Sequence, residues 1–134
     1  MKKENLLKWY DKEYCLKAIK LNPWALQFVK NQTEEICLKA VKQDGLVLKY
    51  IRNPTEEMYL KAVKQDGYTL QYVKNQTEEI CLAAVKQNGL ALKYVKNPTE
   101  EMYLIALNKN IKAIKYIDIK KFPEVYEKYL FMVK

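Results

Sequence analysis

The chain repeats itself every 22 residues, and this period constrains the fold more than any other feature of the sequence. Residues 31–52 read NQTEEICLKAVKQDGLVLKYIR and residues 75–96 read NQTEEICLAAVKQNGLALKYVK, so 17 of 22 positions are identical. Residues 53–74 and 97–118 keep the frame, and residues 9–30 form a more divergent first copy. Such a period is typical of repeat proteins, in which each copy buries its apolar surface against its neighbours.

The copies alternate in their opening residues, which are NQTEEIC in one and NPTEEMY in the next. A duplication of 44 residues is the simplest history for this alternation. The segments 1–8 and 119–134 flank the five copies. We expect both segments to cap the array, the second through a helix that begins at Phe122-Pro123.

The start of each copy predicts a helix N-terminus. Asn53 is a good N-cap, Pro54 suits the first helical position, and Glu56 stands three residues after the cap, as in a capping box. The same pattern follows Asn31, Asn75 and Asn97. We therefore expect the first helix of each copy to be capped by this asparagine.

A second helix begins near the middle of each copy. The pairs Asp44-Gly45, Asp66-Gly67 and Asn88-Gly89 align with Asn22-Pro23 in the first copy and Asn110-Ile111 in the last. Proline cannot adopt a positive φ and isoleucine resists it, so the Asp or Asn is expected to cap the second helix. On this interpretation the glycine is permissive and not required.

Both predicted helices are broadly apolar. On a helical wheel the apolar residues of the first helix cover an arc of about 200°, which requires cover on two sides. Stacking against neighbouring copies provides that cover. The sequence therefore predicts an all-α fold, an α-solenoid of five 22-residue helix-turn-helix repeats with terminal capping helices, in a single domain over 1–134.

The shared motif T-E-E-x-C/Y-L-x-A-V-K-x-x-G-x-x-L-x-Y-V, found over 33–51 and 77–95, resembles a family of short helical repeats. That family is classed as a domain of unknown function and occurs in bacteria, phages and giant viruses. The first copy departs from the motif over 9–12, and the last copy lacks the glycine. The resemblance implies an interaction scaffold and offers no catalytic residue to carry over.

The residue types argue against catalysis. Histidine and serine are both absent, which removes serine and cysteine triads and histidine-ligated metal sites. Cys15, Cys37 and Cys81 lie on the apolar arc of the first helix, where core packing explains them. The glutamate pairs open the first helices, where carboxylates complement the helix dipole, and Glu35–Lys39 and Glu57–Lys61 have favourable i, i+4 spacing. We expect no enzymatic activity, no cofactor and no metal.

The chain shows no membrane or export signal that we recognise. Charged residues interrupt the N-terminal segment before any secretory apolar core, and no apolar run reaches the length of a spanning helix. Three cysteines without CxxC spacing fit a reducing compartment. We therefore expect a cytoplasmic protein that does not contact membranes.

The net charge of +8 comes from 24 Lys and Arg against 16 Asp and Glu, and the cations are sorted onto the second helices. Stacking would align them into a stripe that attracts an anionic partner, although ordinary solubility also explains them. The predicted stripe contains Lys30, Lys49, Arg52, Lys74, Lys93, Lys96 and Lys115. Three aromatic residues less bound by the repeat, Trp9, Trp24 and Tyr68, are predicted to be exposed anchors for a protein.

A ladder of aromatic residues recurs at one position of the repeat: Phe28, Tyr50, Tyr72, Tyr94 and Tyr116. Such a ladder can stack single-stranded RNA. At helical spacing beside Leu and Val, however, it favours packing in the core with the hydroxyl groups at the edge.

Three functional hypotheses remain. The first is a non-enzymatic protein-binding module whose partner is a protein or a nucleoprotein complex. The family's distribution suggests its narrowest form, a phage or mobile-element inhibitor of a host defence complex, anti-CRISPR-like in blocking an RNA-guided nuclease. The second is an RNA- or single-stranded DNA-binding protein, whose affinity would fall steeply with salt. Glu at positions 49, 52, 93 and 96 would abolish that binding and leave the fold intact. The third is a structural scaffold or spacer.

Overall fold

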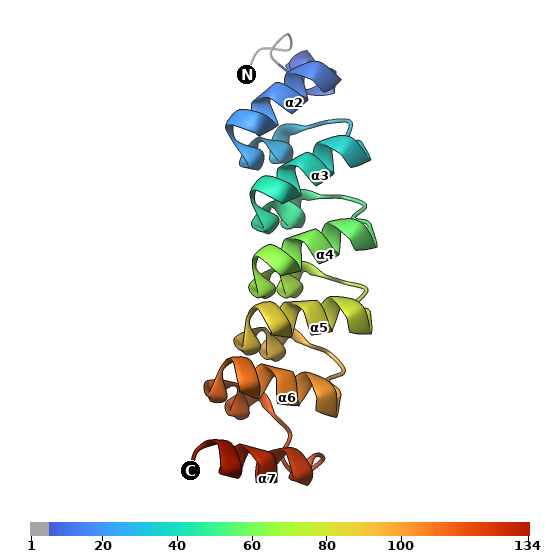
Figure 1. Cartoon of the computed structure of the whole chain (residues 1–134). Helices are drawn as coiled ribbons and strands as arrows, with labels where there is room; N and C mark the ends of the chain where they lie inside the picture. The colour runs from blue at the N-terminus through green and yellow to red at the C-terminus, as the bar shows by residue number, and fades with distance from the viewer. Residues whose placement is uncertain (1–5) are drawn as a thin grey trace. The chain divides into compact units, whose positions relative to one another are not determined.

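The structure is a computed structural model that describes residues 6–134, so residues 1–5 of the predicted N-terminal cap lie outside the described residues. Every regular element within the described range is a helix (Figure 1). The chain divides into two compact units, Met1–Gln65 and Asp66–Lys134. Each unit is described by itself, and the prediction of one domain over 1–134 stays a prediction.

Each of the five copies pairs one α-helix with one 3₁₀-helix. The α-helices of the copies are α2 (Lys12–Leu21), α3 (Glu34–Gln43), α4 (Glu56–Gln65), α5 (Glu78–Gln87) and α6 (Glu100–Lys109). The 3₁₀-helices that follow them are η2 (Pro23–Phe28), η3 (Gly45–Tyr50), η4 (Gly67–Tyr72), η5 (Gly89–Tyr94) and η6 (Ile111–Tyr116). A short 3₁₀-helix, η1 (Lys8–Tyr10), precedes the copies, and α7 (Pro123–Met132) follows them.

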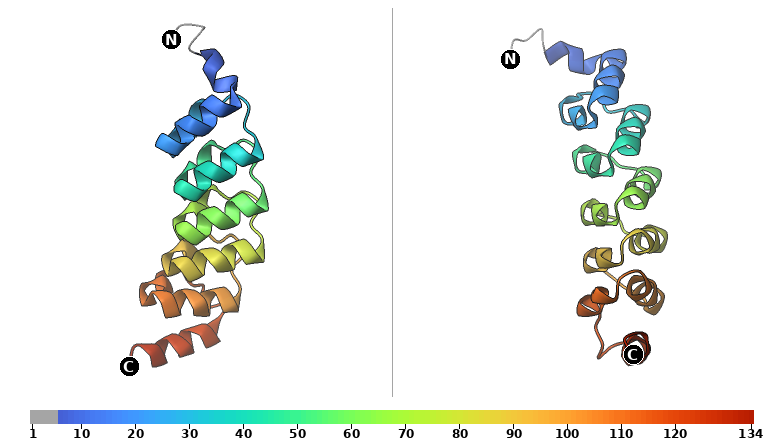
Figure 2. Two further views of the ribbon diagram at one scale, coloured as in Figure 1. Left: turned by 45° about the horizontal axis from the view of Figure 1, so that its top comes forward. Right: turned by 60° about the vertical axis from the view of Figure 1, so that its left-hand side comes forward.

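Two layers run through each unit (Figure 2). In the first unit, α2, α3 and α4 pack in order, and η2 lies beside η3. In the second unit, η4, η5 and η6 pack in order, beside a layer formed by α5, α6 and α7. Each unit is thus a stack of helical repeats, which confirms the predicted all-α solenoid class.

The second helix of each copy is a 3₁₀-helix and not an α-helix. In η3, the N–H of Ile51 donates to the carbonyl of Leu48 at 3.1 Å, and that of Val47 donates to Asp44 at 3.2 Å, three residues apart in each case. A period of three places Gly45, Leu48 and Ile51 on one line, and all three are buried. Val47, off this line, is also fully buried, so the helix buries more than one row of side chains.

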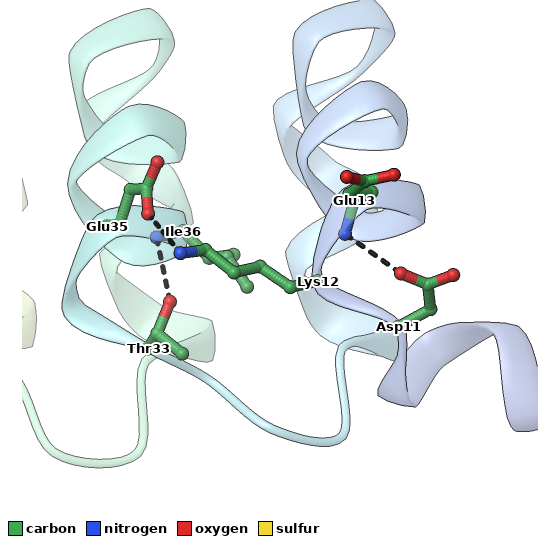
Figure 3. A network of polar contacts seen from close by, with 6 residues as sticks. All are labelled: Asp11, Lys12, Glu13, Thr33, Glu35 and Ile36. Carbon is green, nitrogen blue, oxygen red and sulfur yellow. Dashed lines mark hydrogen bonds and ion pairs between the residues drawn. The ribbon is translucent and has the colours of Figure 1, made fainter.

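The predicted asparagine caps and capping boxes of the α-helices are wrong. The Thr33 hydroxyl, two residues after Asn31, accepts the hydrogen bond from the N–H of Ile36 at 3.2 Å. Asp11 holds the same place in the first copy and accepts from the N–H of Glu13 at 3.0 Å (Figure 3). Both residue types are good N-caps, so the threonine cap shortens each predicted helix by two residues.

In two of the copies a glutamine anchors the segment before the threonine cap. The Gln32 side chain donates to the carbonyl of Tyr50 at 2.8 Å and accepts from the N–H of Arg52 at 3.0 Å. Gln76 makes the equivalent two hydrogen bonds, at 2.8 and 3.0 Å, in the second unit. These contacts hold the start of the copy against its own end.

The predicted caps of the second helices are confirmed. Asp44 accepts from the N–H of Leu46 at 2.9 Å, and Asn22, Asp66, Asn88 and Asn110 cap their helices in the same way. No residue of the described chain has a positive φ. The prediction that the glycine is only permissive is wrong, because a Cβ on Gly45 would lie 2.9 Å from the carbonyl oxygen of Ala62.

The final helix begins where the sequence predicts, with Pro123 at its first turn. Val125 is fully buried, and the Phe122 ring meets the Tyr103 ring edge to face, with centroids 5.0 Å apart. Farther along α7, Phe131 remains 75 % exposed. The helix therefore covers part of the end of the second unit and leaves apolar side chains on its outer face.

Candidate partner-binding face

Three of the cations predicted for the stripe lie in 3₁₀-helices, and the other four lie two residues after the end of one. All seven are exposed: Lys30, Lys49 and Arg52 in the first unit, and Lys74, Lys93, Lys96 and Lys115 in the second. The 3₁₀-helices of the five copies contain no Asp or Glu. Acidic residues instead occupy the first turns of the α-helices, so the two layers differ in charge.

Two of these cations are engaged by the main chain. The Arg52 guanidinium donates to the carbonyls of Lys30 at 2.8 Å and Val29 at 3.2 Å. In the second unit, the Lys96 ammonium donates to the carbonyl of Lys74 at 3.1 Å. These side chains tie one copy to the end of the copy before it. The expectation that Glu at positions 52 and 96 leaves the fold intact therefore conflicts with the structure.

A different role belongs to Lys49, whose ammonium lies over aromatic rings. Its Nζ atom is 5.3 Å from the ring centroid of Trp24 and 5.1 Å from that of Tyr50. The two rings meet edge to face, with centroids 5.7 Å apart. The Trp24 indole N–H donates to a carboxylate oxygen of Asp44 at 2.9 Å. We call Trp24, Lys49 and Tyr50 the first aromatic–lysine cluster.

The same arrangement recurs 44 residues later, in the second unit. The rings of Tyr68 and Tyr94 meet edge to face at 6.1 Å, and the Lys93 ammonium lies 4.9 Å from the centroid of Tyr94. The Tyr94 side chain, as hydrogen-bond partner and neighbouring charge, raises the pKa of Lys93, and Tyr116 and Tyr68 add to the increase. We call Tyr68, Lys93 and Tyr94 the second aromatic–lysine cluster.

The aromatic ladder lies at the surface and not in the core. Tyr50, Tyr72, Tyr94 and Tyr116 are half-buried, and Phe28 is 45 % exposed. The prediction of core packing is therefore wrong for Phe28. The four tyrosines are partly buried and partly exposed. Lys115 precedes the last tyrosine of the ladder, and its Nζ atom lies 5.2 Å from the ring centroid of Tyr116.

Of the three predicted anchors, Trp24 and Tyr68 are half-buried members of the clusters, whereas Trp9 is buried with 8 % exposure. The Trp9 ring packs against Tyr14 and Phe28 at centroid distances of 5.2 and 5.3 Å. Its carbonyl accepts from the N–H of Lys30 at 3.0 Å. The prediction of an exposed Trp9 is wrong, because this residue closes the first copy.

The three cysteines are buried, as predicted. Burial raises the pKa of each thiol, to about 11 for Cys37. A raised pKa keeps sulfur in the protonated form, which is a poor nucleophile and a poor metal ligand. Within residues 6–134, no group of three or more Cys, Asp or Glu side chains is arranged to hold a metal ion.

The glutamates of the first turns make ion pairs within the α layer. Glu35 pairs with Lys12 of the preceding copy at 2.6 Å (Figure 3) and not with the predicted Lys39. The hydrogen bond and charge of Lys12 lower the pKa of Glu35. Glu57 pairs with Lys61 at 3.9 Å, as the i, i+4 spacing predicts.

A polar pocket of about 300 Å³ opens in the first unit and is lined mainly by residues of the second and third copies. Gln32, Cys37 and Arg52 are among its lining residues. The amide of Gln32 and the guanidinium of Arg52 already bind the main chain here. Two of the polar side chains that line the pocket are therefore already used in contacts within and between copies.

Stacked α–3₁₀ copies with a charged aromatic face define a helical-repeat protein. The chain belongs to the family described as a domain of unknown function (DUF4116), whose model matches residues 11–54 and 55–98. Each match spans two of the 22-residue copies, in agreement with the inferred 44-residue duplication. Neither a curated protein nor a solved structure matches the chain. No helix of the described part is long and apolar enough to cross a membrane.

Proposed function

We propose that this protein is a non-enzymatic protein-binding module that presents the 3₁₀ layer of each unit to its partner. The observation that carries the proposal is the recurrence of one aromatic–lysine cluster 44 residues after the other, at the surface. Tryptophan and tyrosine dominate the binding energy of protein interfaces because they desolvate large areas with few rotatable bonds. Half-buried rings held by their neighbours lose little further freedom on binding.

The buried thiols support the absence of enzymatic activity. The three cysteines are the best nucleophiles in a chain without serine or histidine, and their raised pKa values oppose thiolate formation. Many of the other recurrent polar groups cap helices, form ion pairs or link copies. This distribution favours a surface that binds over a site that reacts.

The contacts of the cations and aromatic rings on this face favour a protein partner over a nucleic acid. Arg52, the one arginine, donates to main-chain carbonyls, and Lys96 does the same. Base stacking requires open ring faces, whereas Lys49 and Lys93 lie over the rings and the rings of each cluster meet edge to face. Narrowing the partner to an RNA-guided nuclease in a host defence complex, and placing the protein in the cytoplasm, both stay predictions.

Affinity capture from the native host tests the proposal, with half of each sample treated with nuclease. The bait is compared with a Trp24→Ala/Tyr68→Ala variant, which removes one ring from each cluster. Its matched control is Lys42→Gln/Lys86→Gln, because these exposed lysines of α3 and α5 are also 44 residues apart. We expect a nuclease-resistant partner that the ring variant loses and the control retains. Nuclease-sensitive capture, or equal capture by all three baits, contradicts the proposal.

A further inference from the structure

The two aromatic–lysine clusters differ at one position that bears directly on charge. Asp44 caps η3 in the first unit, and one of its carboxylate oxygens also accepts the Trp24 indole N–H at 2.9 Å. The residue 44 positions later is Asn88, which caps η5 through its side-chain oxygen at 2.9 Å. The first cluster therefore contains a carboxylate of its own, and the equivalent residue beside the second cluster is neutral.

The exposed ammonium of the second cluster lies beside tyrosine side chains. The groups that act on Lys93 are the side chains of Tyr94, Tyr116 and Tyr68. The carboxylate of Asp66, which caps η4, accepts from the N–H of Tyr68 at 2.9 Å and is not among the groups that shift Lys93. The Lys93 ammonium is thus exposed over the Tyr94 ring, and no Asp or Glu side chain is among the groups that act on it.

We propose that the second aromatic–lysine cluster binds the carboxylate of an acidic peptide segment, in the place that Asp44 fills in the first cluster. This inference rests on the proposed function and names the chemistry of the partner. The ammonium of Lys93 pairs with a Glu or Asp side chain, and the rings of Tyr68 and Tyr94 contact the apolar part of the same segment. Lys115, one copy farther along the layer, supplies a second positive charge.

Charge complementarity supports an acidic occupant. The segments of η4, η5 and η6 contain three lysines and no Asp or Glu. In the first cluster the Asp44 carboxylate accepts from the Trp24 indole N–H at 2.9 Å, so a carboxylate fits beside a cluster of this kind. A hydrogen bond between a carboxylate and a cationic or aromatic N–H or O–H donor is stronger than one between neutral groups.

Two cap exchanges test the inference without removing a cap, because Asp and Asn both cap 3₁₀-helices in this chain. Asn88→Asp places a carboxylate beside the second cluster, and Asp44→Asn removes the one beside the first. The probe is a short fluorescein-labelled peptide of alternating Glu and Leu, followed by fluorescence anisotropy. Lys93→Gln should weaken binding about tenfold, the scale of one lost charge-assisted hydrogen bond. Asn88→Asp should weaken it similarly, and Asp44→Asn should add a second site.

Controls separate the possible outcomes. Lys86→Gln carries the same charge change as Lys93→Gln but lies on α5, and it should leave binding unchanged. A Gln–Leu peptide should not bind, and an oligothymidylate should bind more weakly than the Glu–Leu peptide. The inference is overturned if Asn88→Asp and Lys93→Gln bind like the parent, or if the oligothymidylate binds more tightly. If capture from the native host still depends on Trp24 and Tyr68 in that case, the proposed protein-binding function stands. Only the proposal of an acidic partner is then rejected.

Discussion

The Cα atom of Gly45 lies so close to the next α-helix that an added Cβ would stand 2.9 Å from the carbonyl oxygen of Ala62 and 3.1 Å from its Cα atom. In the second unit, a Cβ on Gly67 would meet the carbonyl oxygen of Ala84 at 2.5 Å, and one on Gly89 would clash with that of Ala106. Glycine is thus required here by the approach of two backbones, although none of the three has a positive φ.

Gly45→Ala should therefore destabilise the protein. At a position with ordinary φ, the change from glycine to alanine stabilises by about 0.4–1 kcal/mol through the unfolded chain. The clash with Ala62 reverses the sign, and we expect a net loss of about 1–3 kcal/mol in the free energy of unfolding. Urea denaturation measures this difference. An unchanged or higher free energy of unfolding would show that the two backbones separate at little cost.

Thr33→Ala should cost about 1 kcal/mol in the free energy of unfolding, the usual scale for a lost N-cap. The Thr33 hydroxyl accepts the N–H of Ile36, and alanine leaves that donor to water. Asn31→Ala is the matched comparison, because Asn31 is exposed and lies two residues before the Thr33 cap. Thermal unfolding of both variants distinguishes the caps. A larger loss for Asn31→Ala would restore the asparagine cap that the sequence suggested.

Some features of the fold can be predicted because the five aligned copies exclude the alternatives. The cap at Asp44 follows from comparing five copies, since Pro23 and Ile111 exclude the alternative backbone. Comparing the copies cannot identify the cap of the α-helices. Asn and Thr occur two residues apart in four copies, and both are good N-caps. In the copies with Gln32 and Gln76, hydrogen bonds between residues 18 and 20 positions apart hold the residue before the threonine outside the helix. The threonine also caps the helix in the copies that have Pro54 and Pro98 at this position.

The candidate site was predictable only in part. Sorting of lysines onto the second helices is visible in the sequence, and Trp24 and Tyr68 stand out because they break the repeat. Arg52 and Lys49 are both cations on the same 3₁₀ layer, yet one binds carbonyls and the other lies over rings. Only contacts between copies separate these roles. Trp9 belongs to the divergent copy, where the repeat gives no rule for its burial.

Arg52→Ala should destabilise the protein more than Lys49→Ala. The guanidinium donates to two carbonyls of the preceding copy, and the loss of such bonds costs about 1–3 kcal/mol. Lys49 contributes a cation–π contact at an exposed site, worth about 0.5–1 kcal/mol. Arg52→Lys should fall between, because Lys96 reaches the equivalent carbonyl in the second unit. Urea denaturation ranks the three variants, and equal losses for Arg52→Ala and Lys49→Ala would contradict the assigned link.

The stability of the protein should fall as pH rises from about 9 to about 11, in part because of Cys37. Burial raises the pKa of this thiol from 9.0 to about 11, so in this window the unfolded chain loses a proton that the folded protein keeps. The raised pKa therefore contributes stability that is complete below about pH 9 and is lost as the pH approaches 11, by about 1–2 kcal/mol.

Lysines and tyrosines also titrate in this pH range, so the measurement is the difference between the parent and Cys37→Ala. Urea denaturation at pH about 8 and about 10.5 should show a smaller decline for Cys37→Ala. Parallel declines would mean that the folded Cys37 thiol titrates like an exposed one.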